Sequence, residues 1–236
     1  MVMENLTFRA SQLVKLRWSD ENIWTPKAKH APTKTEIFCS ADCASGSGFA
    51  MAMAQQHGDR KPWLWVQDEQ SRKRSGIPCI HGFPESLRSG CHYISPANIE
   101  DVLFALEEGL RCTALSFVIG EIAGDPIALG FTQSRRLAVA SEAHGVPLYL
   151  LRTNASRTLS AARMRWEIEP AASEPLLANP KAPGAPVWQA ELFRSRLFQP
   201  SHWPLSYDRG ELSIAAPRDR VDLASVSGDR PLAMSG

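Results

Sequence analysis

The sequence lacks the features of a disulfide-stapled, a membrane-spanning or a strongly basic protein. Its five cysteines show no paired spacing, which favours reduced thiols over a disulfide framework. It has no run of about 18 apolar residues, and its N-terminus has no basic stretch followed by an apolar one, which argues against a membrane span and a secretion signal. The formal net charge is only +1, from 26 basic and 25 acidic residues. We therefore expect a cytoplasmic protein with no membrane contact, whose DNA contacts are local or indirect.

Residues 35–56, TEIFCSADCASGSGFAMAMAQQ, have the strand–loop–helix layout of a nucleotide-binding P-loop but lack its lysine. In the best alignment with G-x-x-x-x-G-K-[ST], Gly46 occupies the lysine position and Ser47 keeps the hydroxyl that would reach Mg²⁺. Asp42 adds a negative charge, which is unfavourable in a phosphate site. The residues of this degenerate phosphate loop are Ser40, Asp42, Ser45, Gly46, Ser47 and Gly48. The pattern predicts no ATP hydrolysis and no cofactor, with weak nucleotide binding left open.

Strand-like and helix-like segments alternate through the middle of the chain. The run 114–122 is apolar almost throughout, as expected of a strand covered by helices on both faces. Asn98 is a helix N-cap and Gly145 a helix stop. This rhythm predicts right-handed crossovers and a mainly parallel sheet. The expected strands are 35–39, 62–67, 91–95, 114–122 and 146–152, and the expected helices are 44–57, 98–110 and 134–145.

The two ends of the chain differ from this central part. Residues 1–32 read as an N-terminal helix, over 4–18, followed by a polar linker. The segments 163–169 and 187–196 are expected to form an antiparallel hairpin at the sheet edge. Residues 201–236 are rich in Pro, Ser, Asp and Arg, which predicts a disordered tail.

Several stretches taken together resemble the ImuA family, RecA-like bacterial proteins of DNA damage-induced mutagenesis. They are EDVLFALEEGLRCTALSFVIGEIAG, SRRLAVASEAHGVPLYLLR, ARMRWEIEP and APVWQAELFRSR, and the resemblance covers roughly residues 33–200. It implies a RecA-like, P-loop NTPase-type α/β core without a competent ATPase, with helices on both faces of the sheet. It also implies an accessory role in SOS-induced translesion DNA synthesis, nucleoid-associated during DNA damage. The implied partners are an ImuB-type inactive Y-family polymerase, RecA and, indirectly, an error-prone replicative-type DNA polymerase.

Three acidic residues follow apolar strands and are candidates for the strand-end acids of a RecA-type site. Glu121 ends the segment FVIGE, and Asp68 and Glu69 end WVQDE. A Mg²⁺ or water-activating role needs an acid in such a position. The alternative is that these carboxylates are ordinary solvated groups at strand ends.

A second group of residues is typical of binding surfaces, where aromatic and arginine side chains are enriched. Arg135 and Arg136 are expected in the first turn of their helix, either in an ion pair with Glu142 or Glu121 or against a partner or DNA. The basic run 71–76 is expected to be a solvated loop or a phosphate contact. The candidate partner or DNA contacts are Arg135, Arg136, Trp188, Phe193, Arg194, Arg196, Phe198 and Trp203. The alternative for Trp188 is that it packs inward on a strand with Ala190 and Leu192.

Two other functions stay open and two kinds of site are disfavoured. The open functions are a RecA-superfamily ATPase with an atypical loop and a SulA-like inhibitor of cell division. A zinc site from Cys79, His81, Cys91 and His92 is disfavoured, because the last two are adjacent and alternate on a strand. A serine hydrolase elbow is disfavoured because the sequence around Ser47 lacks the first glycine of G-x-S-x-G.

Overall fold

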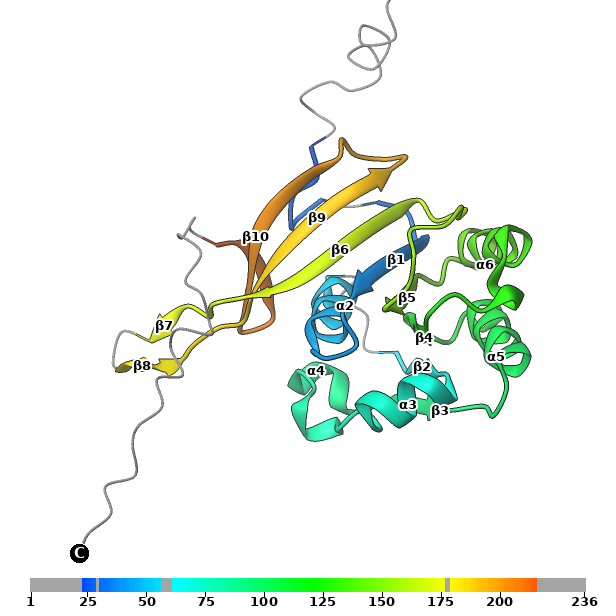
Figure 1. Ribbon diagram of the computed structural model, residues 1–236, viewed down its shortest axis with the longest axis horizontal. Coiled ribbons are helices and arrows are strands. Elements are labelled where there is room, and N and C mark those ends of the chain that lie inside the picture. Colours follow the sequence, from blue (N-terminus) through cyan, green and yellow to red (C-terminus); the bar gives the residue numbers. More distant parts are fainter. Residues whose placement is uncertain (1–22, 29, 57–60, 177–178, 216–236) are drawn as a thin grey trace, which may run out of the picture.

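The computed structural model of the chain describes residues 23–28, 30–56, 61–176 and 179–215. These residues form a mixed α/β structure around one nine-stranded sheet, with a separate two-stranded hairpin that projects from the body (Figure 1). The strands of the large sheet are β1 (Lys34–Cys39), β2 (Trp63–Gln67), β3 (Cys91–Ile94), β4 (Val118–Ala123), β5 (Leu148–Thr153), β6 (Met164–Ala171), β9 (Val187–Ser195), β10 (Ser201–Asp208) and β11 (Glu211–Ile214). The hairpin consists of β7 (Pro175–Leu176) and β8 (Asn179–Pro183).

The sheet is mostly parallel, as the sequence predicts. Its order is β11-β10-β9-β6-β1-β5-β4-β2-β3. The six strands from β6 to β3 pair in parallel, and β9, β10 and β11 extend the sheet in antiparallel pairs. The loop that follows β1 lies at the carboxyl edge of the parallel strands. Because β1 is central in this order, the loop is near the middle of that edge.

Helices cover both faces of the parallel part, because its strands bury apolar residues on both sides. On one face Phe49 and Met53 of α2 pack in the larger core, and on the other Leu106 of α5 and Leu137 of α6 pack in the second core. None of the helices within the described ranges is long and apolar enough to cross a membrane. The helices are α2 (Ser45–Gln55), α3 (Glu69–Ser75), α4 (Glu85–Arg88), α5 (Ile99–Arg111) and α6 (Phe131–His144), with short 3-10 turns at Ile80–Gly82 and Ile127–Leu129.

The caps predicted from the sequence are present. The Asn98 side chain accepts a hydrogen bond from the Asp101 backbone N–H at the start of α5. Gly145 ends α6 in the left-handed conformation, with φ of 70°. However, α6 begins at Phe131, three residues earlier than predicted, so Arg135 and Arg136 lie in its second turn and not its first.

The C-terminal part of the sheet differs from the sequence prediction in two ways. β6 and β9 are antiparallel as expected, but they are not at the edge, because β10 and β11 continue the sheet beyond them. Average composition predicts a disordered tail from residue 201 onward, and for residues 201–214 this prediction is wrong. They form strands because Trp203, Leu205 and Leu212 are buried in the larger core.

The segment 23–28, which we call the N-terminal strap, crosses the face of the sheet next to α2. Its Trp24 is 1% exposed and packs edge-on against Trp166, with ring centroids 4.7 Å apart, and against Trp203 at 5.2 Å. The sequence predicts a polar linker here. The structure differs in that the segment packs against the sheet, because Trp24 is buried. The predicted helix over 4–18 lies outside the described residues.

A charged cluster is buried on the other face of the sheet, under α6. Glu36 lies between two cations: its Oε1 is 2.8 Å from Lys34 Nζ and its Oε2 is 2.8 Å from Arg165 Nε. The hydroxyls of Ser134 and Ser160 complete the hydrogen bonds of the lysine. All three charged side chains are at most 2% exposed. The pairing makes burial tolerable, since an unpaired charge in this position would be strongly destabilising.

Candidate functional site

A cleft of about 650 Å³ opens where β1, β2 and β4 end at the carboxyl edge of the sheet. Its walls come from the loop 40–44, the first two turns of α2, the end of α3 and the segment 76–83. Ligands of open parallel sheets bind in such positions, outside the carboxyl ends of the strands. The volume is in the range of small-molecule pockets.

The degenerate phosphate loop forms one wall of the cleft. Asn154, at the end of β5, accepts a hydrogen bond from the Ala41 backbone N–H at 2.9 Å and adopts the left-handed conformation with φ of 50°. Helix α2 then begins at Ser45, and Ala44 makes no side-chain cap to its first N–H groups. Asp42 and Ser47 line the cleft, whereas Ser40, Ser45, Gly46 and Gly48 do not.

Gly46, at the lysine position of the motif, is buried and closely packed. A Cβ atom at this residue would lie 2.4 Å from Cys39 Sγ, and one at Gly48 would lie 3.0 Å from Trp188 Cζ2. Burial raises the pKa of the Cys39 thiol to about 12, even though the Gly46 N–H donates to its sulfur. A side chain at the lysine position of the motif would therefore force the buried Cys39 thiol to shift.

Glu121 is the acid of β4 that lines the cleft. It is 5% exposed, and its carboxylate accepts hydrogen bonds from Gln67 Nε2 at 3.0 Å and Ser75 Oγ at 3.1 Å. Burial raises the pKa of Glu121, and the negative charge of Asp68 raises it further, against the lowering effect of these hydrogen bonds. Glu121 takes part in none of the ion pairs formed within the described part of the chain. The cleft thus contains a buried carboxylate whose hydrogen bonds from side chains come from neutral groups.

The other two candidate acids are engaged in local structure. Asp68 caps α3: its Oδ1 accepts from the Ser71 N–H at 2.8 Å and its Oδ2 from the Ala123 N–H at 3.2 Å. Glu69 is outside the cleft and pairs with Lys73 one helical turn later, at 2.8 Å. Both side chains therefore have partners that account for their presence at the end of β2.

Two buried polar atoms lining the cleft have no hydrogen-bond partner within the described residues. They are the indole Nε1 of Trp65 and the hydroxyl of Ser71, on side chains that are each 2% exposed. The indole nitrogen is near enough to Glu121 to lower the pKa of that carboxyl, but it is not aligned for a hydrogen bond. Arg74 contributes the single basic side chain among the described residues that line the cleft.

The sequence singles out neither Trp65 nor Gln67, and it marks Arg74 and Ser75 only as part of the basic run 71–76. Trp65 and Gln67 alternate along β2 and so share a face, a signal that strand periodicity could have supplied. Arg74 and Ser75 lie on α3, where the sequence predicts a loop because EQSRKRS has no apolar stripe. The helix forms through the Asp68 cap and the pair between Lys73 and Glu69.

The candidate partner contacts are divided by the structure into buried and exposed residues. Trp188 and Trp203 are core residues at 5% and 9% exposure, so neither offers its ring to a partner. Phe198 is half-buried near the strap, and Phe193 is half-buried on the opposite face, where its ring contacts Phe38 and lies under the Arg157 guanidinium. The exposed members of the group are Arg135, Arg136, Arg194 and Arg196.

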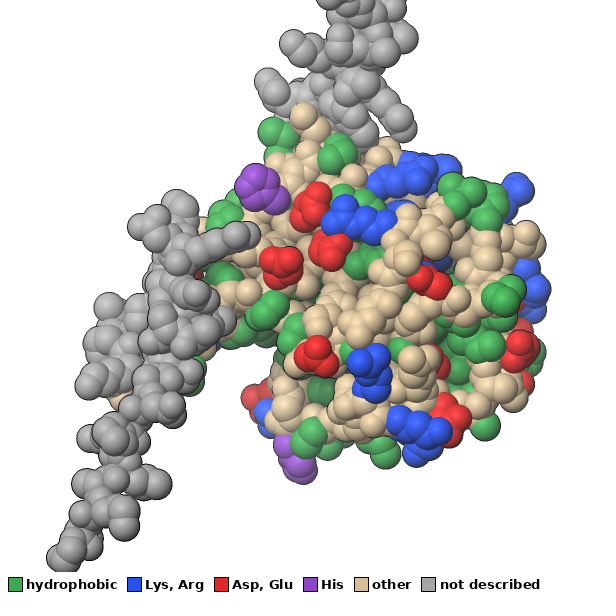
Figure 2. All heavy atoms as spheres, in the orientation of Figure 1, with side chains coloured by type: hydrophobic (Ala, Val, Ile, Leu, Met, Phe, Trp, Pro, Cys, Tyr) green, Lys and Arg blue, Asp and Glu red, His purple; other side chains and the backbone are tan. Residues whose placement is uncertain are grey.

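Arg135 and Arg136 line a second cavity, of about 450 Å³, between α5 and α6. Arg136 pairs with Glu107 at 2.7 Å, and not with Glu142 or Glu121. Glu107 is 7% exposed, because Arg111 and Arg136 both cover it. On the face in Figure 2, acidic and basic side chains are interspersed, without a broad surface of one sign.

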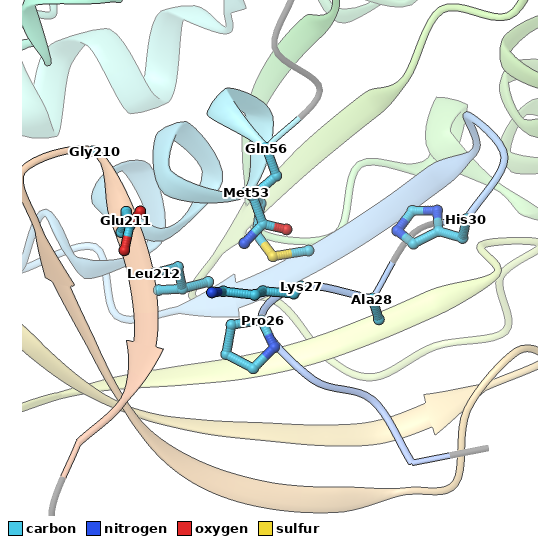
Figure 3. A pocket seen from close by; sticks show the side chains of 9 residues that line it. All are labelled: Pro26, Lys27, Ala28, His30, Met53, Gln56, Gly210, Glu211 and Leu212. Carbon is cyan, nitrogen blue, oxygen red and sulfur yellow. The ribbon is translucent and has the colours of Figure 1, made fainter. Parts of the chain in front are cut away.

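A third cavity, of about 570 Å³, lies between the strap, the end of α2 and β11. Met53 of α2 and Gln56, which follows its last residue, point toward Lys27 of the strap, and Leu212 of β11 lies beside the end of the Lys27 side chain (Figure 3). No cluster of three His, Cys, Asp or Glu side chains among the described residues could hold a metal ion.

Comparison with protein-family models finds no match to the chain, and comparison with curated proteins finds none that is significant.

Proposed function

We propose that the chain is a non-catalytic accessory protein of SOS-induced translesion DNA synthesis, built on a RecA-like core. It would act in the cytoplasm, at the nucleoid during DNA damage, by docking an ImuB-type inactive Y-family polymerase and RecA. Contact with an error-prone replicative-type polymerase and with DNA would be indirect. The resemblance of residues 33–200 to the ImuA family is the source of this proposal, and the mostly parallel sheet with its strand–loop–helix unit supports it.

One observation carries the non-catalytic part of the proposal. A Cβ atom at Gly46 would lie only 2.4 Å from Cys39 Sγ, so any side chain at the lysine position requires the buried Cys39 to shift. A P-loop needs that lysine to bind the β- and γ-phosphates and to stabilise charge during phosphoryl transfer. The loop instead carries Asp42, whose charge repels phosphate. These features favour a docking role over nucleotide turnover.

The test combines a turnover assay with a binding assay on the full-length chain. We expect no ATP hydrolysis above a buffer blank, with or without DNA, and co-elution with the ImuB-type partner in size-exclusion chromatography. Gly46→Lys should not create turnover, and the overpacking should destabilise the fold by about 1–3 kcal/mol or more. Turnover that Ser47→Ala abolishes would overturn the proposal in favour of an atypical ATPase.

The binding assay also separates the proposal from a role in cell division. RecA and the ImuB-type partner should be captured, and the tubulin-like division protein should not. Capture of the division protein alone would instead support a SulA-like inhibitor. Replacing exposed Arg194 and Arg196 by Glu should weaken capture without loss of folding, with exposed Arg72→Glu as a matched charge reversal elsewhere.

A further inference from the structure

The carboxylate of Glu121 is buried at the cleft without a counter-ion. Buried charges in proteins are normally paired, because hydrogen bonds from neutral groups compensate only part of the lost hydration. Gln67 and Ser75 supply two such bonds, and Glu121 forms no ion pair within the described ranges. The carboxylate is therefore incompletely compensated, and the residue that carries it lines the cleft.

Trp65 and Ser71 add an independent observation at the same place. Their unpartnered polar atoms are nine-tenths buried and line the cleft beside Glu121. Unsatisfied buried polar groups are rare in folded proteins, and each one calls for a missing partner. An indole N–H can only donate, and its nearest influence is on the Glu121 carboxylate, to which it makes no hydrogen bond of ordinary geometry, so an acceptor atom of an occupant would complete it.

The charge and shape of the cleft limit what could satisfy these groups. Asp42 and Glu121 are opposed by the single cation of Arg74, so an added anion is disfavoured and an added cation is favoured. A bare metal ion is also disfavoured, because the indole N–H would face it. The cleft wall on this side is aromatic: the Trp65 and Phe83 rings stack on each other with centroids 5.7 Å apart at 6°, and such rings favour a nearby cation over an anion.

We propose that this cleft is a socket for an arginine side chain carried by a loop of a partner protein. In this socket Glu121 is the counter-ion of the guanidinium, and Trp65 and Ser71 donate hydrogen bonds to the peptide carbonyls beside the arginine. The inference rests on the proposed function, since it identifies the surface by which a docking protein engages its partner. An arginine ligand also accounts for the presence of the buried Glu121 in a cleft whose loop, with Asp42 and no lysine, is unsuited to binding phosphate.

The chemistry of the socket can be tested without the partner. The probes are N-acetyl-arginine amide and its neutral isostere N-acetyl-citrulline amide, titrated to millimolar concentration into the ¹⁵N-labelled full-length chain. The indole N–H resonance of Trp65, assigned with Trp65→Phe, reports binding. We expect the arginine amide to shift this resonance and to bind at least about tenfold more tightly than the citrulline amide, since charge-assisted hydrogen bonds are involved.

Variants then identify the counter-ion. Glu121→Gln should abolish the preference for arginine over citrulline, whereas Glu100→Gln, an exposed carboxylate on α5, should leave it unchanged. Arg74→Ala should tighten binding of the arginine amide by removing a competing cation. Equal binding of the two amides, or an arginine preference that survives Glu121→Gln in a folded protein, overturns the inference. Trp65→Phe provides a second variant should Glu121→Gln not fold. Because it lacks the indole reporter, its binding is followed by the backbone amide resonances of residues 40–44, and unchanged affinity in it would equally overturn the inference.

The partner assay distinguishes failure of this inference from failure of the proposed function. If the wild type and Glu121→Gln bind the ImuB-type protein equally well, the socket is wrong and the docking function stands. If neither binds the partner or RecA, the proposed function is wrong and the partner assignment of the socket fails with it. A loss of about tenfold or more in Glu121→Gln alone supports both.

Discussion

At the scale of single residues, Glu36 shows how a buried charge network depends on one carboxylate. Its two oxygens hold Lys34 and Arg165, and the Ser160 hydroxyl donates a third hydrogen bond at 2.6 Å. Burial by itself would raise the pKa of Glu36, but the neighbouring cations and the serine lower it below the ordinary value. The Arg165 guanidinium already has one nitrogen, Nη2, without a partner among the described residues. Losing Glu36 would therefore leave two uncompensated cations in the core.

We predict that Glu36→Gln lowers the free energy of unfolding by about 3–5 kcal/mol, the cost of breaking a buried pair by removing one partner. Urea denaturation at neutral pH measures this change. The control is Glu191→Gln, in a half-exposed pair with Arg157, which should cost at most about 1 kcal/mol. Equal costs in the two variants would show that the cluster is not the stabilising network described above.

The same carboxylate gives the wild type a predictable dependence on pH. Because the folded-state pKa of Glu36 is lower than its unfolded value of about 4.3, its stabilisation is present above that value and is lost as pH falls through the folded pKa. The raised pKa of Glu121 acts in the opposite sense, so its contribution is present at low pH and is lost as pH rises through the folded pKa. Glu36→Gln should therefore lose less stability than the wild type as pH falls below about 4.3, and Glu121→Gln should lose less as pH rises above that value.

At the scale of elements, the N-terminal strap behaves as part of the core although it has no regular secondary structure. Trp24 fills a space between β6 and β10, where it contacts Trp166 and Trp203. It lies on the same face of the sheet as Phe49 of α2, whose ring also packs against Trp166. Its removal should expose this aromatic cluster to water.

We predict that Trp24→Ala destabilises the fold by about 3–5 kcal/mol, as for other buried aromatic truncations. Ile23→Ala, at a 45% exposed neighbour, should change stability by no more than about 0.5 kcal/mol. Hydrogen exchange should show faster exchange of β10 amides in Trp24→Ala alone. If the two variants unfold at the same denaturant concentration, the strap does not belong to the cooperative core.

At the scale of the whole molecule, the antiparallel extension of the sheet determines where the chain can be shortened. Trp203, Leu205 and Leu212 are at most 9% exposed and join the larger core, which also contains Trp24 and Trp188. A chain ending at residue 200 loses all three side chains. At about 2–5 kcal/mol each, their loss approaches or exceeds the total stability of about 5–15 kcal/mol expected of a domain.

We predict that a chain ending at residue 200 lacks cooperative thermal unfolding and near-ultraviolet circular dichroism, whereas a chain ending at residue 215 keeps both. The longer of these two chains is the appropriate one for asking whether residues 216–236 contact a partner. A well-folded chain ending at residue 200 would contradict the role assigned to β10 and β11.

The sequence predicted the parallel part of the sheet within a few residues at most strand ends. Its strands are short apolar runs separated by amphipathic helices, and such periodicity is a local property. It missed α3 because a polar heptapeptide carries no apolar stripe, and it missed β10 and β11 because proline- and serine-rich neighbours obscured their alternation. It also placed Trp188 and Trp203 among binding residues, since composition does not distinguish a buried aromatic ring from an exposed one.

The sequence by itself determined the balanced charge, the α/β rhythm and the absence of a lysine from the loop after β1, because each is a property of residues close together in the chain. The tertiary structure alone decided that Gly46 lies against Cys39, that Glu121 has no counter-ion beside Trp65 within the described residues, and that Glu36 holds two cations. These outcomes depend on strand order and on which face each side chain occupies. Local periodicity does not encode the through-space distances on which electrostatic and packing energies depend.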